Sequence, residues 1–350
     1  MKKTITINKT NIGESYPPYV IAEMSANHNG NINDAFKIIE KAKKSGANAV
    51  KIQTYKPSTI TIKSEQPDFL IKDGLWEGRS LYELYDWAHT PWSWHKDLFD
   101  YAKKTDITMF SSPFDKTAVD LLEDLNAPAY KIASFEIIDL PLIRYTASTK
   151  KPIIISTGMA DDKEIEEAIE AAREVGCEDI AILHCVSGYP APPEDYNLKT
   201  LIDMKKRFGV ITGISDHTLS NVTALASVSL GASIIEKHFT LDRTRGGPDD
   251  SFSLEEKDLV ELCNSSKIAW SSIGKIDYSR KKSEQTNLKF RRSLYFVKDL
   301  KKGNIINEDD IKSIRPGFGI SPKYFDEIVG KKVLKDIEYG TPVKFESIEN

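Results

Sequence analysis

Two histidines that each close a short β-branched run are the first candidates for chemistry in this sequence of 350 residues. His217 ends the run that begins at Gly213, and His238 ends the run that begins at Ser233, with an apolar, helix-like stretch between them. Parallel strands need a dozen or more residues between them, and the 21 positions that separate the histidines fit one strand–helix–strand unit. Neighbouring strands lie about 4.8 Å apart, so both imidazoles can meet on one ion. We therefore predict a metal site at His217 and His238, with two polar residues that merely end strands as the alternative.

Two lysines stand at the ends of other strand-like runs, among serines that can donate hydrogen bonds. Lys51 and Lys131 are costly to bury without a partner, and together with the serines they suit a multiply charged anion such as a phosphate. The serines at these strand ends include Ser111, Ser112, Ser134 and Ser156. Glu23 and Glu136 are candidates for proton transfer, because a carboxylate near lysines and a metal can be tuned toward neutral pH. Ion pairs between these lysines and glutamates are the structural alternative, and a Schiff-base lysine is a chemical one.

The elements that must position these residues alternate between short apolar runs and helical patterns. Eight runs are predicted as strands: Tyr19–Met24, Ala49–Thr54, Ile107–Ser111, Ala129–Ile132, Pro152–Ser156, Ile180–Cys185, Val210–Ile214 and Ser233–His238. Strands that alternate with helices indicate an α/β fold with a parallel sheet. Eight units within about 270 residues favour a closed (β/α)8 TIM barrel, whose active site lies at the carboxyl ends of the strands.

Two connections at that end of the barrel are predicted to be functional. The first runs from Pro57 to Ser80, and a loop longer than about 15 residues in a compact domain is usually functional; an excursion packed on the barrel is the alternative. The second follows the eighth strand and carries paired glycines that let a loop close. Asp249 in this second loop is a candidate to reach a polyol, although a solvated turn fits the sequence equally well.

Composition and pattern changes divide the chain into three parts. Residues 1–273 form the predicted catalytic barrel, residues 274–289 a polar linker, and residues 290–350 a small β-rich module that is marginal on its own. A net charge of −4 with mixed signs argues against nucleic acid or anionic lipid as a partner. Three cysteines without metal or redox spacing indicate reduced thiols. The sequence has neither a signal-peptide pattern nor an apolar run of about 18 residues, so we expect a cytoplasmic protein without a membrane partner.

An ordered series of motifs resembles the sialic acid synthase family. The motifs are Ile21–Gly30, Lys51–Thr54, Phe110–Phe114, Tyr130–Glu136, Ser156–Met159, His184–Cys185, Ser215–Thr218 and Glu236–Thr240. The tail around Arg315 resembles the antifreeze-like (SAF) domain that ends these enzymes. The resemblance implies a TIM barrel followed by a SAF domain. It also implies the condensation of phosphoenolpyruvate with a 2-acetamido sugar, assisted by a divalent metal, first Mn²⁺ and otherwise Mg²⁺ or Co²⁺.

The resemblance further implies a role for each matching residue. The metal ligands would be His217 and His238, and Glu23 would be the base that helps water add. The phosphoenolpyruvate contacts would be Lys51, Gln53, Ser112, Lys131, Ser134, Ser156, Ser187 and Ser215, where Ser187 departs from the family's asparagine. The sugar contacts would be Glu136, Tyr189 and Asp249. Arg315 would hold an N-acetyl group after delivery into the partner's barrel of a domain-swapped homodimer. The catalytic set would be Glu23, Lys51, Lys131, Glu136, His217 and His238.

The long connection also bears on the acceptor sugar. Residues 68–85 and 90–95 resemble the pseudaminic acid branch of the family more than the N-acetylneuraminate branch, which implies 2,4-diacetamido-2,4,6-trideoxy-L-altrose as acceptor and a role in a cell-surface glycan such as that of flagellin. Phe135 and Trp76 are candidates to face the deoxy end of that sugar. The alternatives are N-acetylmannosamine or a legionaminic acid precursor as acceptor, a metal-free Schiff-base aldolase that uses Lys131, and a non-enzymatic sugar-binding protein.

Overall fold

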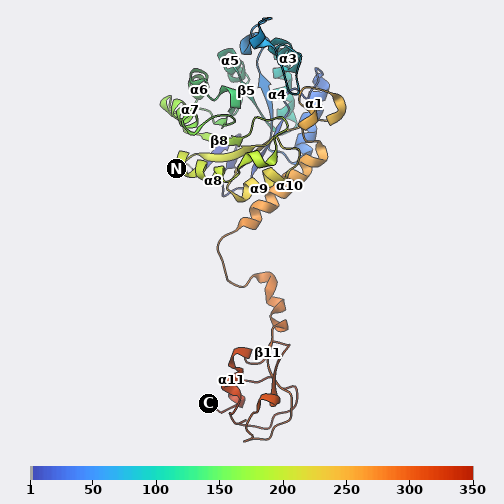
Figure 1. The fold of residues 1–350 in the computed structure, drawn as a ribbon, viewed down its shortest axis with the longest axis vertical. Helices are drawn as coiled ribbons and strands as arrows, with labels where there is room; N and C mark the ends of the chain where they lie inside the picture. Colours follow the sequence, from blue (N-terminus) through green and yellow to red (C-terminus); the bar gives the residue numbers. More distant parts are fainter. Residues whose placement is uncertain (1–2, 350) are drawn as a thin grey trace. The chain divides into compact units, whose positions relative to one another are not determined.

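The computed structural model describes residues 3–349, which divide into two compact units after Gly274 (Figure 1). Eight parallel strands close into a barrel in the first unit. They are β3 (Tyr19–Glu23), β4 (Ala49–Thr54), β5 (Thr108–Pro113), β6 (Tyr130–Ile132), β7 (Ile153–Ser156), β8 (Ile180–Cys185), β9 (Ile211–Ser215) and β10 (Ile234–His238). Each strand pairs with the next along the chain, and β10 pairs with β3 to close the barrel. The predicted TIM barrel is confirmed.

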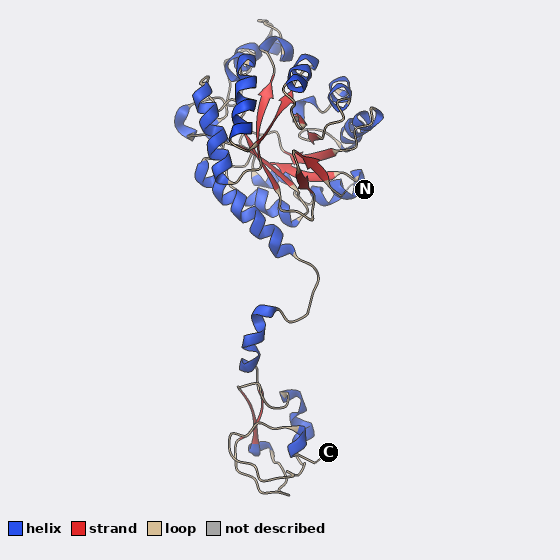
Figure 2. Ribbon diagram, turned by 180° about the vertical axis from the view of Figure 1, so that it is seen from behind, coloured by secondary structure: helices blue, strands red, loops and turns tan. Residues whose placement is uncertain are grey.

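Helices surround the strands on the outside of the barrel (Figure 2). They are α1 (Ile32–Ser45), α4 (His95–Lys104), α5 (Lys116–Asp124), α6 (Leu140–Ala147), α7 (Asp162–Glu174), α8 (Thr200–Phe208), α9 (Val222–Ser229) and α10 (Glu256–Ile273). Local sequence sets several of their ends. The side chains of Asn31, Asp115 and Asp161 accept hydrogen bonds from first-turn amides of α1, α5 and α7. Gly46 and Gly209 end α1 and α8 in the left-handed conformation that glycine adopts readily.

A hairpin that the sequence analysis did not predict closes the amino-terminal end of the barrel. It consists of β1 (Ile5–Ile7) and β2 (Thr10–Ile12), which pair antiparallel. The side chains of Ile5, Ile7 and Ile12 are buried in one cluster with residues of the barrel interior. The three-residue strands are too short to show a clear alternating pattern, although their isoleucines do recur two positions apart. The barrel interior is therefore packed at this end, and the opposite end is left for a site.

The long connection after β4 contains α2 (Pro57–Ile60), the 3₁₀ turn η1 (Pro67–Phe69) and α3 (Leu81–Ala88). α3 begins at a capping box in which Ser80 and Glu83 bind each other's backbone amides. Other 3₁₀ turns in this unit are η2 (Trp92–Trp94), η3 (Ser134–Glu136), η4 (Pro193–Tyr196), η5 (Arg243–Arg245) and η6 (Asp250–Phe252). η3 directly follows β6, and η4 lies in the connection that follows β8, so both belong to the carboxyl end of the barrel.

The second unit is small and has its own apolar core. Its elements are η7 (Lys282–Phe290), β11 (Ser293–Phe296), η8 (Glu308–Asp310), β12 (Ile311–Ile314), η9 (Pro322–Tyr324), α11 (Phe325–Ile328) and η10 (Phe345–Ser347). β11 and β12 pair antiparallel, and isolated bridges such as Leu300–Ile337 and Val333–Ile348 extend the pairing. The core includes Leu294, Phe296 and Val343. Within residues 3–349, no helix has the length and apolarity needed to cross a membrane.

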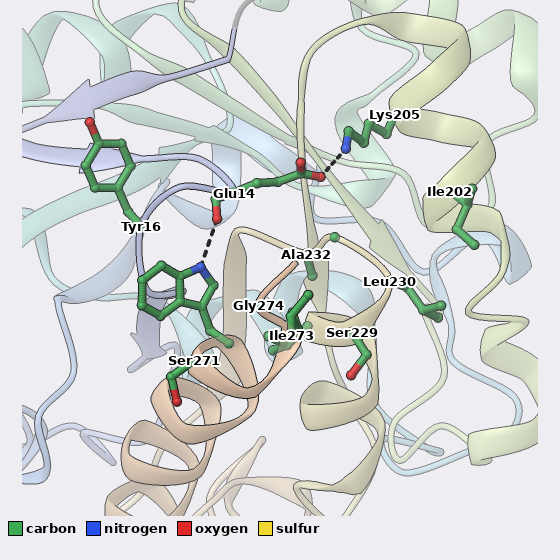
Figure 3. Close-up of a pocket in the computed structure, with 13 residues that line it drawn as sticks. Glu14, Tyr16, Ile202, Lys205, Ser229, Leu230, Ala232, Ser271, Ile273 and Gly274 are labelled. Atoms are coloured by element: carbon green, nitrogen blue, oxygen red, sulfur yellow. Dashed lines mark hydrogen bonds and ion pairs between the residues drawn. The ribbon is translucent and has the colours of Figure 1, made fainter. Parts of the chain in front are cut away.

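A hollow of about 640 Å³ lies at the amino-terminal end of the barrel, where α9 and α10 end beside α8 (Figure 3). We call it the amino-end hollow. Glu14 crosses it and forms an ion pair with Lys205, and the Trp270 indole donates a 2.8 Å hydrogen bond to the Glu14 carbonyl oxygen. Its wall also includes Ile202, Leu230 and Ile273. This end of a barrel contributes stability rather than chemistry in enzymes of this fold.

Candidate active site

The carboxyl ends of the strands bring the charged side chains of the candidate site together. Successive side chains of a strand point to opposite faces, so Lys51 and Gln53 of β4 share the barrel interior, as do Glu236 and His238 of β10. The strand register places Glu23 of β3 beside both Lys51 and His238. Glu23, Lys51 and Glu236 are buried. Buried charges require partners, and these residues provide them for one another.

One carboxylate oxygen binds both lysines at the centre of this cluster. Glu236 Oε1 lies 2.9 Å from Lys131 Nζ and 3.2 Å from Lys51 Nζ. The same oxygen accepts a 3.2 Å hydrogen bond from the Ser215 hydroxyl. Lys51 Nζ also lies 3.3 Å from Glu23 Oε2. The ion pairing that the sequence analysis kept as a structural alternative is thus present for Lys51 and Glu23, whereas the carboxylate that binds Lys131 is Glu236 rather than Glu136.

Burial and ion pairing shift the pKa values of the groups in this cluster in opposite directions. Burial raises the pKa of Glu23 to about 7, against the opposing effect of Lys51. At Glu236 burial acts in the same direction, but the two lysines outweigh it and hold the pKa of that carboxyl far below its usual range. Burial lowers the pKa of Lys131, while Glu23 and Glu236 outweigh burial at Lys51 and raise its pKa. Lys51 is held in its protonated form while the Glu23 carboxyl is partly neutral, so the cluster suits an anion.

Small hydroxyl side chains and a glycine lie at the ends of β6, β7 and β8. The Gly158 amide donates a 3.3 Å hydrogen bond to Ser134 Oγ. A Cβ at Gly158 would lie 2.2 Å from Ser187 Oγ and 2.7 Å from Ser134 Oγ, so any larger residue would have to displace these hydroxyls. The buried hydroxyls of Ser156 and Ser187 have no hydrogen-bond partner in the protein. Unused donors around a glycine suit the oxygens of a phosphate group.

The two histidines lie together, as the sequence analysis predicts. The ring centroids of His217 and His238 are 5.4 Å apart, at an interplanar angle of 61°. His217 Nδ1 lies 2.8 Å from the Val186 carbonyl oxygen. A carbonyl only accepts hydrogen bonds, so Nδ1 carries a proton, and in the neutral form of the ring the lone pair lies on Nε2. His238 Nδ1 is buried without a hydrogen-bond partner and lies 3.8 Å from Asp249 Oδ2.

These histidines fit a divalent ion, although they supply only part of its coordination. Burial, reinforced by His217, holds the pKa of His238 well below its usual value, and the neutral imidazole is the form that binds metals. Residues 3–349 contain no group of three or more His, Cys, Asp or Glu side chains arranged to hold a metal ion. An ion at this pair would therefore keep its other positions for water or substrate, as in open catalytic sites.

A cavity of about 200 Å³ opens beside His238. Its polar wall includes Asp249, whose Oδ2 accepts a 2.5 Å hydrogen bond from Ser25 Oγ. Ser25 in turn accepts a 2.8 Å hydrogen bond from Gln53, which also donates to Glu23 Oε1 over 3.1 Å. The aromatic wall consists of Tyr55, Trp76, Tyr85, Phe114, Phe135 and Tyr189. A pocket with one polar and one aromatic wall suits a small ligand that is itself part polar and part apolar.

Glu136 and Tyr189 lie on the border between this cavity and the charged cluster. Burial raises the pKa of Glu136 to about 7, and its Oε2 has no hydrogen-bond partner. A carboxyl with such a pKa can accept or donate a proton near neutrality. The ring of Tyr189 lies 4.4 Å from that of His217 between centroids and 6.0 Å from that of Trp76. Tyr189 therefore connects the histidine pair to the aromatic wall.

The structure brings the predicted site residues of the first unit to one end of the barrel. These are Glu23, Lys51, Gln53, Ser112, Lys131, Ser134, Glu136, Ser156, Ser187, Tyr189, Ser215, His217, His238 and Asp249. Ser112 accepts a 3.3 Å hydrogen bond from Lys51. The prediction for Ser111 was wrong, because its hydroxyl lies 2.6 Å from Thr54 Oγ1 and donates to the Ile52 carbonyl oxygen. Neighbouring residues of a strand face opposite sides, so Ser111 and Ser112 cannot both face the site. Arg315 lies in the second unit, where it is exposed, and its role stays a prediction.

Two residues at the centre of the site were missed as site residues. Glu236 received no role beyond its place in the Glu236–Thr240 motif, although its position two residues before His238 on the same strand indicates the same face. Cys185 is one of the three predicted reduced thiols and part of the His184–Cys185 motif, but it was given no role in the site. Its Sγ lies 3.4 Å from Ser134 Oγ and 3.9 Å from His217 Nδ1. Strand alternation was the signal that could have identified both residues.

The fold and this site define a (β/α)8-barrel enzyme with an anion-binding cluster and a histidine pair at the carboxyl ends of its strands. Comparison with known proteins is more specific. The NeuB family profile matches residues 38–278, and the SAF domain profile matches residues 291–349. The chain belongs to the NeuB family. The predicted resemblance to sialic acid synthases with a terminal SAF domain is confirmed.

Similar proteins include two synthases and a solved structure. The pseudaminic acid synthase of Campylobacter jejuni is 44% identical over 328 residues, which cover 93% of this chain and 95% of that protein. The N,N'-diacetyllegionaminic acid synthase of Campylobacter jejuni is 40% identical over 321 residues, which cover 91% of this chain and 96% of that protein. The crystal structure of N-acetylneuraminic acid synthetase from Leptospira borgpetersenii, in complex with citrate, has a TM-score of 0.73 at 30% identity and covers 83% of this chain and 97% of that one. These relatives show that the chain is an enzyme and exclude the sugar-binding alternative.

Proposed function

We propose that this enzyme condenses phosphoenolpyruvate with 2,4-diacetamido-2,4,6-trideoxy-L-altrose to give pseudaminic acid and phosphate. The observation that carries the proposal is the cluster in which Lys51 and Lys131 surround one oxygen of Glu236. Phosphoenolpyruvate carries a carboxylate and a phosphate, and two buried lysines beside unused hydroxyl donors suit both groups. The name of the relative that is 44% identical over most of both chains supports the choice of product.

The phosphoenolpyruvate site in this proposal consists of the lysines and the surrounding serines. The contacts would come from Lys51, Gln53, Ser112, Lys131, Ser134, Ser156, Ser187 and Ser215. Support comes from the partnerless hydroxyls of Ser156 and Ser187 and from the close approach of Ser134 and Ser187 to Gly158. A serine at position 187 gives this site a short hydroxyl donor. The phosphate would then lie where backbone and hydroxyl donors converge.

The acceptor sugar would occupy the 200 Å³ cavity. Glu136 and Asp249 would bind its hydroxyl and amide groups, since both carboxyls line the polar wall. Trp76 and Phe135 would face its apolar C6 methyl group. Trp76 is held in the wall by a 3.1 Å hydrogen bond from its indole to the Pro248 carbonyl oxygen. An apolar wall favours a methyl group over a hydroxymethyl group, which would lose hydrogen bonds to water there.

The reaction in this proposal forms a carbon–carbon bond and breaks a carbon–oxygen bond. C3 of phosphoenolpyruvate attacks the aldehyde carbon of the open-chain sugar, and water adds to the positive C2. Glu23 accepts a proton of that water, for which a pKa of about 7 is well matched. The bond from C2 to the phosphate oxygen then breaks as the C2 hydroxyl loses its proton and becomes the keto group. The two protons of the water end on the former aldehyde oxygen and on the phosphate, which leaves a 2-keto acid and inorganic phosphate. Lys51 and Lys131 offset the negative charge throughout, and the rigid strand ends hold both reactants in reach of each other.

His217 and His238 are the residues that would hold a divalent ion in this site, first Mn²⁺ and otherwise Mg²⁺ or Co²⁺. When bound, the ion would polarise the aldehyde oxygen of the sugar as a Lewis acid. The support is the closeness of the two rings and the partnerless Nδ1 of His238. His238→Ala should abolish both Mn²⁺ binding and turnover, with the thermal melt retained. Full activity in this variant would remove His238 from the set of ligands.

We also propose a domain-swapped homodimer in which Arg315 holds the N-acetyl group of the acceptor in the partner's barrel. Exposure of this arginine and the terminal SAF domain support the proposal. Arg315→Ala should raise the KM for the sugar about tenfold or more, the loss expected for a charged hydrogen bond, and leave the KM for phosphoenolpyruvate unchanged. Arg292→Ala in the same unit is the matched control. A monomer with full activity in analytical ultracentrifugation and kinetics would contradict the swapped dimer.

The experiment that tests the proposed function is phosphate release from phosphoenolpyruvate with three acceptors, in Mn²⁺ and in excess chelator. The acceptors are the altrose derivative, the legionaminic acid precursor and N-acetylmannosamine. We expect release only with the altrose derivative and only with metal. Release with the legionaminic acid precursor would retain the reaction and change the acceptor, an alternative that the 40% identical relative supports.

The Schiff-base alternative is tested in the same preparation. An aldolase would use Lys131 as a nucleophile toward pyruvate and would remain active in chelator. Borohydride with pyruvate would then trap a covalent adduct that mass spectrometry locates. We expect no adduct, because the Lys131 ammonium is ion-paired with Glu236 at 2.9 Å. An adduct at Lys131 together with chelator-insensitive turnover would contradict the condensation.

A further inference from the structure

One segment of the chain binds His217 at three points. The segment, Val186–Tyr196, follows β8 and ends in η4. Its Val186 carbonyl oxygen lies 2.8 Å from His217 Nδ1. Its Ala191 amide donates a 3.1 Å hydrogen bond to the His217 carbonyl oxygen. The His217 amide donates a 2.8 Å hydrogen bond to the Tyr196 hydroxyl. The backbone amide, the backbone carbonyl and the ring are therefore all fixed from the same side.

The Tyr196 hydroxyl links both sides of this turn. The side chain is fully buried, and its hydroxyl donates a 3.0 Å hydrogen bond to the Ser215 carbonyl oxygen while it accepts one from the His217 amide. The ladder between β8 and β9 ends at the pair of Cys185 and Ser215. Beyond that pair, the hydroxyl provides the donor and the acceptor that a neighbouring strand would have provided. The Tyr196 hydroxyl thus binds the backbone of Ser215 and that of His217 at the same time.

A buried lysine holds the same turn from the opposite side. Lys237 lies between Glu236 and His238 on β10, so its side chain points out of the barrel. Its Nζ lies 2.8 Å from Asp216 Oδ2, 2.8 Å from the Thr218 carbonyl oxygen and 2.9 Å from the Ser220 carbonyl oxygen. These contacts use all three donors of the ammonium group. Lys237 therefore anchors the loop after His217, and Tyr196 fixes the turn before it.

We propose that Tyr196 is a positioning residue whose hydroxyl sets the distance between Ser215 and His217. The proposal rests on the proposed function, in which Ser215 binds phosphoenolpyruvate and His217 binds the metal. The phenol itself is not in the cavity lining and is bound on both sides by backbone, so its role is indirect. Groups that orient a ligand from behind typically change metal affinity by 10-fold to 100-fold when they are removed.

The substitution Tyr196→Phe tests this role, because it removes the hydroxyl and keeps the ring. Tyr130→Phe is the matched control: Tyr130 is also fully buried, and its hydroxyl binds the Glu123 carboxylate away from the site. We expect Tyr196→Phe to weaken Mn²⁺ binding about tenfold in the full-length, metal-free protein, measured from the electron paramagnetic resonance of free Mn²⁺. We expect it to weaken phosphoenolpyruvate binding in calorimetry as well. Tyr130→Phe should leave both affinities unchanged even where its thermal melt falls equally.

The outcomes separate this inference from the proposed function. Wild-type protein that binds Mn²⁺ and phosphoenolpyruvate supports the proposed function, and the difference between the two phenylalanine variants then decides the role of Tyr196. Equal affinities in Tyr196→Phe and Tyr130→Phe would overturn it, whatever happens to the melting temperature. If the wild-type protein binds phosphoenolpyruvate but does not bind Mn²⁺, only the metal assignment is contradicted. In that case unchanged phosphoenolpyruvate affinity in Tyr196→Phe would overturn the inference, and a selective loss would support it.

Discussion

The amino-end hollow and the carboxyl-end site both contain polar groups, but those of the hollow are paired with each other and several of those at the carboxyl end have no hydrogen-bond partner. The amino-end hollow, about 640 Å³, is larger than the carboxyl-end cavity of about 200 Å³. In the hollow, the Glu14 carboxylate forms an ion pair with Lys205. The Glu14 backbone carbonyl oxygen accepts a hydrogen bond from the Trp270 indole. At the carboxyl end, several buried polar atoms have no hydrogen-bond partner: Glu136 Oε2, Ser156 Oγ, Ser187 Oγ, Glu236 Oε2 and His238 Nδ1. Within the described part of the chain, no such atom belongs to a residue that lines the hollow.

The difference shows that volume is a poor guide to the site and that unsatisfied polar atoms are a better one. A buried polar atom without a partner costs about 1–3 kcal/mol, so a folded protein retains several of them in one place only where something else offsets the cost. Binding of a substrate or an ion at the carboxyl end would do so. The hollow has no such cost, because its charged groups bind each other. Substitutions at the carboxyl end should therefore change the kinetics of the enzyme, and substitutions in the hollow should change only its stability.

The largest expected difference in kcat/KM is between variants of two lysines, each of which forms an ion pair with a glutamate. Lys131→Met should lower kcat/KM by about 10²–10³-fold, because it removes a preorganised positive group from the anion site. Lys205→Met in the hollow should leave kinetics unchanged, since a half-exposed ion pair contributes at most about 1 kcal/mol to stability. Steady-state phosphate release from both variants measures this. Comparable kinetic loss in both would contradict the distinction between the two ends.

A pair of glycines provides the next comparison. In Gly158→Ala the new Cβ would meet Ser187 Oγ at 2.2 Å and displace it, and a misplacement of about 1 Å can cost about 10²-fold in rate. We expect kcat/KM for phosphoenolpyruvate to fall by that order. Gly231→Ala in the hollow acts on a glycine with φ of +99°, so it should cost about 1–3 kcal/mol of stability and leave kcat/KM unchanged. Kinetics and urea unfolding of both variants check these results. An active Gly158→Ala variant would place the phosphate elsewhere.

The pH dependence of the free energy of unfolding should show how much stability the protein loses when the buried Glu136 carboxyl ionises. Burial raises the pKa of Glu136 from 4.5 to about 7, so the native protein loses stability as pH rises from about 4.5 to about 7. Glu136→Gln lacks this ionisation. The variant should be more stable than wild type at pH 8, and the difference should vanish at pH 4, where the wild-type carboxyl is neutral in both states. Urea unfolding at a series of pH values measures it. A variant less stable than wild type at pH 8 would contradict the account.

The smallest effect is expected at the tryptophan of the hollow. Trp270→Phe removes the indole N–H that donates to the Glu14 carbonyl oxygen over 2.8 Å. A neutral hydrogen bond contributes about 1 kcal/mol, so we expect a loss of that order in urea unfolding and no change in kcat or KM. A kinetic effect from this variant would show that the hollow is coupled to the reaction.

Much of the fold and of the site could be predicted from the sequence. The eight strands were identifiable because each contains a short apolar run between turn signals, and the strand ends supplied Lys51, Lys131 and His238 directly. The hairpin that plugs the barrel was not predicted, because strands of three residues offer too few positions for a pattern. Identifying Glu236 and Cys185 as site residues required the alternation of strand faces to be applied residue by residue. The prediction for Ser111 was wrong because this alternation was not applied there.

Other features depend on contacts between segments that are distant in sequence. The Tyr196 hydroxyl acts on Ser215 and His217 through backbone groups, which no side-chain motif reports. The partner of Lys131 is Glu236, 105 positions away. Trp76 reaches the Pro248 carbonyl oxygen across 172 positions. Such pairs are determined only once the barrel closes and sets which strand ends are neighbours.

The most direct test of the central claim is a crystal structure with Mn²⁺ and phosphoenolpyruvate, in which anomalous scattering locates the metal. We predict a metal peak between His217 and His238, and phosphoenolpyruvate density against Lys51 and Lys131. Ligand density in the amino-end hollow, or a carboxyl end that stays empty at saturating concentrations of both, would contradict the assignment of the active site.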